Sequence, residues 1–152
     1  MSVDWAGADH ETSVSFGTIP AYQDNAVIAA VWCASLGTGP GFPPTGSQSY
    51  SALNQQSPDY LAWQLPKDDP IRMFRELGES GHLTPGAAAQ LAGRLADIAF
   101  WLEESYRILS RDMDYWIGSE ERQLYDRCAH AVHFLLRECA VAAAKNKDIK
   151  WG

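Results

Sequence analysis

Two long stripes of apolar side chains dominate the second half of the chain. The first recurs at helical spacing through "TPGAAAQLAGRLADIAFWLEESYRIL" and beyond, and its members are Leu91, Leu95, Ile98, Leu102, Tyr106, Leu109 and Met113. The second follows Ser119, and its members are Leu124, Cys128, Val132, Leu135 and Cys139. Side chains spaced three or four residues apart lie on one face of a helix. The pattern predicts two long helices, over roughly residues 85–116 and 119–145, that form an antiparallel hairpin turning near Ile117 to Ser119.

Shorter helices are predicted from the residues that start them. "SPDYLAWQLP" and "DPIRMFRELG" each place a capping side chain, Ser57 or Asp69, directly before a proline. A capping residue followed by proline at the first helical position is typical of a helix start. Thr84 stands before a proline in the same way, and it is expected to cap the first long helix.

The apolar segment "DNAVIAAVWCASLG" admits two interpretations. It offers Asp24 or Asn25 as a helix cap, an alanine-rich body, and Gly37 as a stop. These signals favour a buried helix. A buried strand is the alternative, because a short apolar run has no periodicity that separates the two.

Short strands are predicted near both ends of the sequence, where apolar and polar residues alternate. The alternating apolar residues are Val3 and Trp5, Val14 and Phe16, and Ile149 and Trp151. Alternation with a period of two is typical of half-buried strands. Together with the helices, it predicts a mostly helical α+β fold. Residues 1–152 are expected to form one domain, with a small sheet made by the terminal strands.

The six tryptophans divide by their positions in these elements. Three lie within apolar helical segments and are expected in the core: Trp32, Trp63 and Trp101. Trp5 and Trp151 lie on the predicted end strands and are expected to pack on each other. Trp116 is the one whose place a helical stripe alone does not explain.

Trp116 belongs to the segment "RDMDYWIGSEE", the predicted turn of the long hairpin. It is next to Tyr115, and four acids surround the pair: Asp112, Asp114, Glu120 and Glu121. In one interpretation, the two aromatic side chains fold inward and cap the helical core. In the other, they face outward as aromatic anchors inside an acidic rim, which is the composition of an interface hot spot.

The charge distribution limits the kinds of partner. The net charge is −7, and residues 1–66 contain five acids and no Lys or Arg. A phosphate-binding surface needs clustered basic side chains, and the sequence has no such cluster, so nucleic acid is not expected as a direct ligand. A basic protein is the expected partner, because opposite potentials steer association.

Cysteine and histidine spacing argues against a metal centre, a disulfide and cysteine catalysis. Cys128 and Cys139 would stand ~16 Å apart on one helix, whereas a disulfide needs Cα atoms within ~7 Å. Cys128 and His130 would point to opposite faces of that helix. Asp126 and His130 can pair on one face, but zinc needs three or four converging ligands, and the histidines outside this helix, His10 and His82, lie in unrelated segments. No cofactor or metal is therefore expected.

These observations support a non-enzymatic, acidic protein-binding domain that neutralises or regulates a basic partner, as an inhibitor or immunity protein does. The start of the sequence lacks the features of a signal peptide, and its longest apolar run is too short to span a bilayer. A cytoplasmic location is therefore expected, with no membrane partner. Homo-oligomerisation stays open. The alternatives are a small enzyme or ligand-binding protein, with a pocket between the N-terminal half and the hairpin, and a structural subunit of a larger assembly.

Overall fold

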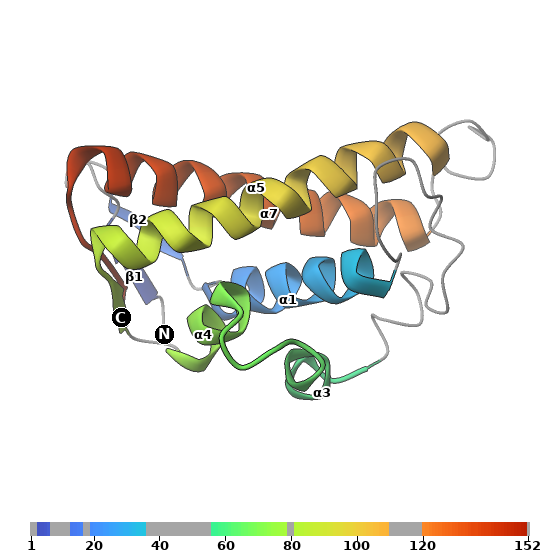
Figure 1. Ribbon diagram of the computed structural model, residues 1–152, viewed down its shortest axis with the longest axis horizontal. Helices are drawn as coiled ribbons and strands as arrows, with labels where there is room; N and C mark the ends of the chain where they lie inside the picture. The colour runs from blue at the N-terminus through green and yellow to red at the C-terminus, as the bar shows by residue number, and fades with distance from the viewer. Residues whose placement is uncertain are drawn as a thin grey trace.

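Helices form most of the structure, a computed structural model that describes residues 3–6, 13–16, 19–35, 56–78, 81–109 and 120–151. Figure 1 shows the helices stacked beside a small sheet. In chain order, the elements are β1 Val3–Ala6, β2 Ser13–Phe16, α1 Ile19–Ser35, α3 Pro58–Trp63, α4 Pro70–Glu76, β3 Gly81–Leu83, α5 Pro85–Leu109, α7 Glu120–Lys145 and β4 Ile149–Trp151. The predicted mostly helical α+β fold is confirmed.

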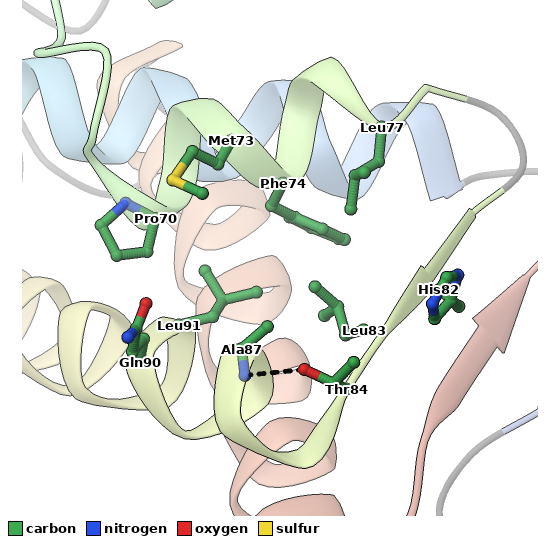
Figure 2. A pocket seen from close by; sticks show the side chains of 10 residues that line it. All are labelled: Pro70, Met73, Phe74, Leu77, His82, Leu83, Thr84, Ala87, Gln90 and Leu91. Atoms are coloured by element: carbon green, nitrogen blue, oxygen red, sulfur yellow. Dashed lines mark hydrogen bonds between the residues drawn. The ribbon is translucent and has the colours of Figure 1, made fainter.

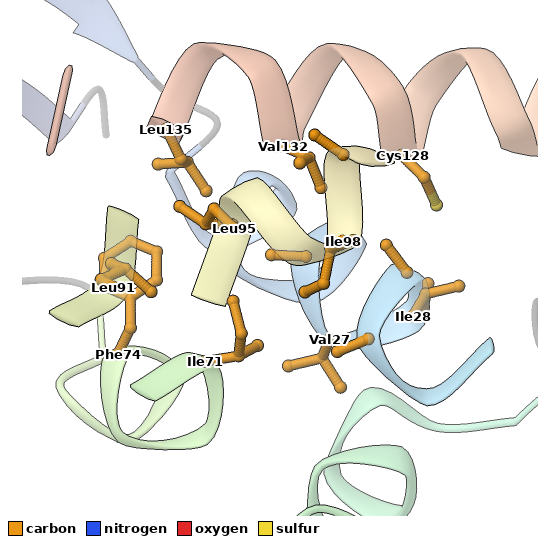
Figure 3. Packing of buried hydrophobic residues seen from close by; sticks show 14 of the residues in the cluster. Val27, Ile28, Ile71, Phe74, Leu91, Leu95, Ile98, Cys128, Val132 and Leu135 are labelled. Carbon is orange, nitrogen blue, oxygen red and sulfur yellow. The ribbon is translucent and has the colours of Figure 1, made fainter. Parts of the chain in front are cut away.

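The two longest helices, α5 and α7, pack along each other and run in opposite directions (Figure 1). The apolar stripes meet between them, as predicted, and Figure 3 shows the buried side chains of Leu95, Ile98, Cys128, Val132 and Leu135. Leu102 is also fully buried. Tyr106 lies in the last described turn of α5, where its ring contacts that of Tyr125 at a centroid distance of 5.4 Å and a tilt of 37°. The antiparallel hairpin is therefore present, and residues 110–119, where its turn was expected, lie outside the described residues.

Helix α1 lies in the middle of the helical core. It contacts α3, α4, α5 and α7, and all eight residues of the segment 26–33 are buried. A helix that is apolar on every side is stable only when other elements cover it on every side. This explains why the segment showed no clear periodicity in the sequence. The helix interpretation is confirmed, but α1 begins at Ile19 rather than at Asp24 or Asn25.

The caps of the shorter helices form as the sequence predicts. The Ser57 hydroxyl accepts a hydrogen bond from the backbone N–H of Tyr60 at 3.1 Å, and Thr84 Oγ1 accepts one from Ala87 at 3.2 Å. Asp69 has two roles, because its Oδ1 caps α4 through the N–H of Ile71, while its Oδ2 pairs with Arg94 of α5 at 3.2 Å. The cap of α4 therefore also fixes α4 against α5.

The sheet has four antiparallel strands in the order β2-β1-β4-β3. The predicted pairing of the terminal strands is confirmed, and the register places Trp5 opposite Trp151. Strand β3 was not predicted, because the three residues of "GHL" are too few to show alternation. Its pairing with β4 places Gly81 opposite Trp151.

The C-terminal end of α4 is held by side chains from two distant elements. Gln23 of α1 donates hydrogen bonds from its Nε2 to the carbonyl oxygens of Phe74, at 3.1 Å, and Gly78, at 3.0 Å. The Gly78 oxygen also accepts a bond from Trp151 Nε1 at 3.0 Å. Gly78 itself has φ 76°, the left-handed conformation that glycine adopts readily at the end of a helix. We name these contacts the Gly78 joint.

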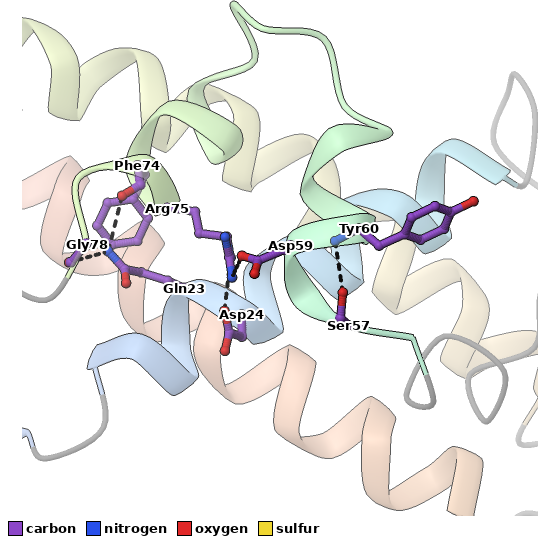
Figure 4. Close-up of polar contacts among 8 residues, drawn as sticks. All are labelled: Gln23, Asp24, Ser57, Asp59, Tyr60, Phe74, Arg75 and Gly78. Atoms are coloured by element: carbon purple, nitrogen blue, oxygen red, sulfur yellow. Dashed lines mark hydrogen bonds and ion pairs between the residues drawn. The ribbon is translucent and has the colours of Figure 1, made fainter.

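A second polar contact ties α4 to α1 and α3, as Figure 4 shows beside the Gly78 joint. The Arg75 guanidinium lies 3.1 Å from an Asp24 carboxylate oxygen and 2.7 Å from an Asp59 oxygen. Asp59 is largely exposed, so solvent screens its pair with Arg75. The contact explains why Asp24 is not a helix cap: it lies inside α1 and faces Arg75.

One core assignment was wrong. Trp63 was expected in the core, but 74% of its surface is exposed. Helix α3 has six residues and buries Leu61 and Ala62, and a residue two positions after Leu61 is rotated by ~200° onto the opposite face. Trp32 is buried as predicted, and Trp101 is partly buried against the core.

Candidate functional site

The acidic turn expected from the sequence lies only partly within the described residues. Four of its residues, Asp112, Asp114, Tyr115 and Trp116, lie outside the described residues. The backbones of Glu120 and Glu121 form the first turn of α7, where acids interact favourably with the helix dipole. The choice between a core cap and an interface therefore stays a prediction.

A different aromatic residue with acidic neighbours lies on α5. Phe100 is 47% exposed, and three of the four side chains next to it on the helix surface, at spacings of three and four residues, are Asp97, Glu103 and Glu104. Residues at these spacings are neighbours on a helix. We name Asp97, Phe100, Glu103 and Glu104 the Phe100 face.

The ring of Phe100 contacts the ring of its neighbour Trp101. The two ring centroids are 6.0 Å apart, with an interplanar angle of 80°, an edge-to-face arrangement that aromatic pairs favour. Asp97 and Glu103 are exposed, and Glu104 is partly buried and pairs with Arg107 at 2.8 Å. The arrangement presents an apolar ring inside a negative rim, which is the chemistry predicted for the turn.

The cysteines are buried free thiols. Burial raises the pKa of the Cys33, Cys128 and Cys139 thiols to about 12 in each case. A nucleophilic cysteine needs its thiolate, and these pKa values keep the thiols protonated at neutral pH. The three cysteine side chains pack in the hydrophobic core as protonated thiols.

His130 lies on the exposed side of α7 and contacts α1. Its Nε2 is 2.9 Å from the Tyr22 hydroxyl, with which it forms a hydrogen bond, while its expected partner Asp126 lies 3.5 Å from Arg122. Among the described residues, no group of three or more His, Cys, Asp or Glu side chains is arranged to hold a metal ion.

A shallow pocket of about 160 Å³ opens between α1 and α7 beside this hydrogen bond. It is lined by Ala21, Tyr22, Asn25, Arg127 and His130. This is the general place where a pocket between the N-terminal half and the hairpin was anticipated.

A second pocket, of about 200 Å³, lies between α4, β3 and the first turns of α5. Figure 2 shows side chains from all three elements converging on it. Its apolar lining includes Met73, Phe74, Leu77, Leu83, Ala87 and Leu91. Thr84 and Gln90 add polar groups on the α5 side, and His82 adds one at the β3 edge. We name it the α4–β3–α5 pocket.

Sequence reasoning missed both the Phe100 face and this pocket. The Phe100 face had a readable signal, because an aromatic residue outside the apolar stripe with acids at helical spacing is unlike a core residue. The α4–β3–α5 pocket had none, because one of its walls is the unpredicted strand β3.

None of the described helices combines the length and the apolarity that crossing a bilayer requires. Comparison with models of known protein families, with curated proteins and with solved structures finds no match to this chain.

Proposed function

We propose that this chain is a non-enzymatic, acidic protein-binding domain that neutralises or regulates a basic protein, in the manner of an inhibitor or a toxin-immunity protein acting in the cytoplasm. The observation that carries the proposal is the Phe100 face. A large apolar ring that is about half exposed has a free energy cost in water, which a partner can remove by covering it. The exposed acids Asp97 and Glu103 lie beside this ring.

The chemistry of the Phe100 face suits a basic side chain. A Lys or Arg cation gains favourable energy over the face of an aromatic ring. The same cation forms charge-assisted hydrogen bonds with neighbouring carboxylates such as Asp97 and Glu103. An aromatic anchor within a charged rim is therefore complementary to a basic segment of a partner.

The charge of the whole molecule supports the same partner class. The net charge is −7. Within the described part of the chain, five arginines form ion pairs with the chain's own acids, and these are Arg72, Arg75, Arg94, Arg107 and Arg122. The excess negative charge attracts a basic protein over a distance of about one Debye length, ~8 Å at physiological ionic strength.

The pocket between α1 and α7 favours a second candidate function, a small ligand-binding protein. Its polar groups, from Tyr22, Asn25, Arg127 and His130, converge from two helices that are far apart in sequence. The pocket is shallow, and we place this function second for that reason.

The test compares baits that differ only at the interface. The wild-type protein, a Phe100→Ala variant and a double Asp97→Asn, Glu103→Gln variant are used to capture proteins from the native source. Trp63→Ala serves as the control, because it removes an aromatic ring that is even more exposed and lies on a different helix, α3. The expected partner is a basic protein that the wild type and Trp63→Ala retain, and that the other two variants lose.

Binding kinetics with the recovered protein separate the two contributions. The double Asp97→Asn, Glu103→Gln variant should associate with the partner more slowly than the wild type, and its association rate should depend less on salt. Phe100→Ala should mainly speed dissociation, by roughly 30-fold, which corresponds to ~2 kcal/mol for an interface anchor.

Two results would change the conclusion in different ways. If the captured protein is not basic, or if no protein is retained by both the wild type and Trp63→Ala, the proposed function is refuted. If the Phe100 variants bind like the wild type, variants of the acidic turn are the next test, with amides at Asp112, Asp114, Glu120 and Glu121 and Trp116→Ala. Loss of binding in these variants keeps the function and moves the interface to the turn.

A further inference from the structure

The walls of the α4–β3–α5 pocket are fixed by contacts that do not involve the pocket itself. The Gly78 joint holds the end of α4, through bonds of 3.0 Å from both Gln23 and Trp151. The Asp69–Arg94 pair holds the start of α4 against α5. A site that is already formed loses little entropy when a ligand binds.

The side chains that line the pocket exclude a charged ligand. The ten described residues that line it include no Asp, Glu, Lys or Arg, and the titratable side chain among them is His82 at the β3 edge. A charge moved from water into an apolar site without a partner of opposite charge is strongly destabilised. The net charge of −7 further disfavours an anion. The ligand that fits is therefore neutral.

The volume limits the ligand to one ring with a small substituent. The pocket measures about 200 Å³, which is below the ~300 Å³ at which pockets for drug-sized ligands begin. It is somewhat larger than the ~150 Å³ engineered cavity that binds benzene. An aromatic ring suits the lining, because the Met73 thioether and the Phe74 ring both make favourable contacts with aromatic groups.

The polar groups lie on the α5 side of the pocket. Thr84 Oγ1 accepts the capping bond from Ala87, so its hydroxyl proton remains to be donated. The Gln90 amide can both donate and accept. A ligand with one hydroxyl or amide group can therefore place its ring against Met73 and Phe74 and its polar end toward α5 (Figure 2).

We propose that the α4–β3–α5 pocket binds a small neutral molecule built on a single aromatic ring that carries one hydrogen-bonding group. This site is separate from the Phe100 face, and the inference does not depend on the proposed protein-binding function.

The test uses 4-ethylphenol as the probe and the methyl groups of methionine as the reporter. The chain has three methionines, so carbon-13 labelling of their methyl groups gives a simple spectrum, and Met73→Leu assigns the pocket signal. Adding 4-ethylphenol should shift the Met73 signal saturably, with a dissociation constant on the order of 1 mM. The carboxylate analogue 4-ethylbenzoate should bind at least tenfold more weakly.

Variants locate the binding within the pocket. Ala87→Leu fills the pocket from α5 and should abolish the saturable shift. Ala89→Leu adds the same atoms at an exposed position nearby and should leave it unchanged. Gln90→Ala should weaken the binding of 4-ethylphenol about fivefold, which is the effect of one hydrogen bond. It should leave the binding of ethylbenzene, which has no hydrogen-bonding group, unchanged.

Three results would contradict the proposed binding site. A shift that rises linearly without saturation, equal binding of 4-ethylbenzoate, or full binding to Ala87→Leu would each do so. If thermal melting shows that Ala87→Leu is not folded, Met73→Phe fills the pocket from α4 instead. Its binding is then measured by saturation transfer to the ligand, and it too should be lost.

Discussion

The Gly78 joint allows a quantitative prediction from the Gln23→Met substitution. Methionine keeps nearly the length and shape of glutamine but removes both hydrogen bonds, to the oxygens of Phe74 and Gly78. Neither oxygen is left without a donor, because Phe74 also accepts from the N–H of Leu77 and Gly78 from Trp151. The expected loss is therefore that of two ordinary hydrogen bonds, ~1–3 kcal/mol in the free energy of unfolding.

The shared acceptor at Gly78 predicts that a second substitution will not be additive. Trp151→Phe alone removes the indole donor and some packing, but it leaves the bond from Gln23. In the double variant, the Gly78 oxygen loses both side-chain donors, and a partly buried carbonyl without a partner costs an additional ~1–3 kcal/mol. The double variant should therefore be less stable than the sum of the two single losses predicts.

The assay is urea unfolding of the four proteins, followed by circular dichroism at 222 nm. The coupling free energy follows from the four midpoints, provided that the slopes agree. Strict additivity of the two losses would refute the reasoning, because it would mean that the Gly78 oxygen does not depend on either donor.

Other predictions follow from the core, the sheet and the thiols. Leu102→Ala and Leu135→Ala should each cost ~2–5 kcal/mol in urea unfolding, because both side chains are fully buried in the hairpin. Gly81→Ala should destabilise the protein by ~1–3 kcal/mol, because the new Cβ would lie 3.0 Å from a ring carbon of Trp151. Gly93→Ala, where nothing lies within 4 Å of the new Cβ, should instead stabilise α5 by ~1 kcal/mol in the same assay. Folding raises the pKa of the three buried thiols to about 12, so the unfolded chain loses these protons at a lower pH than the folded one. The free energy of unfolding should then fall as the pH rises from about 9 toward 12, and a variant lacking one thiol should show a smaller fall.

The parts of the fold that the sequence predicts are those that local spacing determines. The stripes of α5 and α7 and the caps at Ser57, Asp69 and Thr84 depend on residues within one or two turns of each other. The position of β3 depends instead on Trp151, which is far away in sequence and packs where Gly81 has no Cβ. No local pattern contains that information.

The same distinction explains the errors at α1 and α3. The first turn of α1 is held by contacts of Tyr22 and Gln23 with α7 and α4, so the helix begins before the capping residues that its sequence offers. Helix α3 is too short for periodicity to show which face is buried, and Trp63 was placed on the wrong side. For the candidate site, the sequence predicted an aromatic residue among acids in the turn of the hairpin. Among the described residues, the same combination occurs at Phe100 on α5.

The strand order β2-β1-β4-β3 has a consequence for how the chain folds. Strand β4 lies between β1 and β3, so the sheet can be completed only after residues near 150 return to partners near residues 5 and 82. The α5–α7 hairpin needs only neighbouring parts of the chain, and closing its loop costs much less entropy. We therefore expect the helical hairpin to form first and the sheet to close late. Closure of the sheet also brings the Trp151 indole to Gly78, so the end of α4 and the wall of its pocket should become ordered in that same final step.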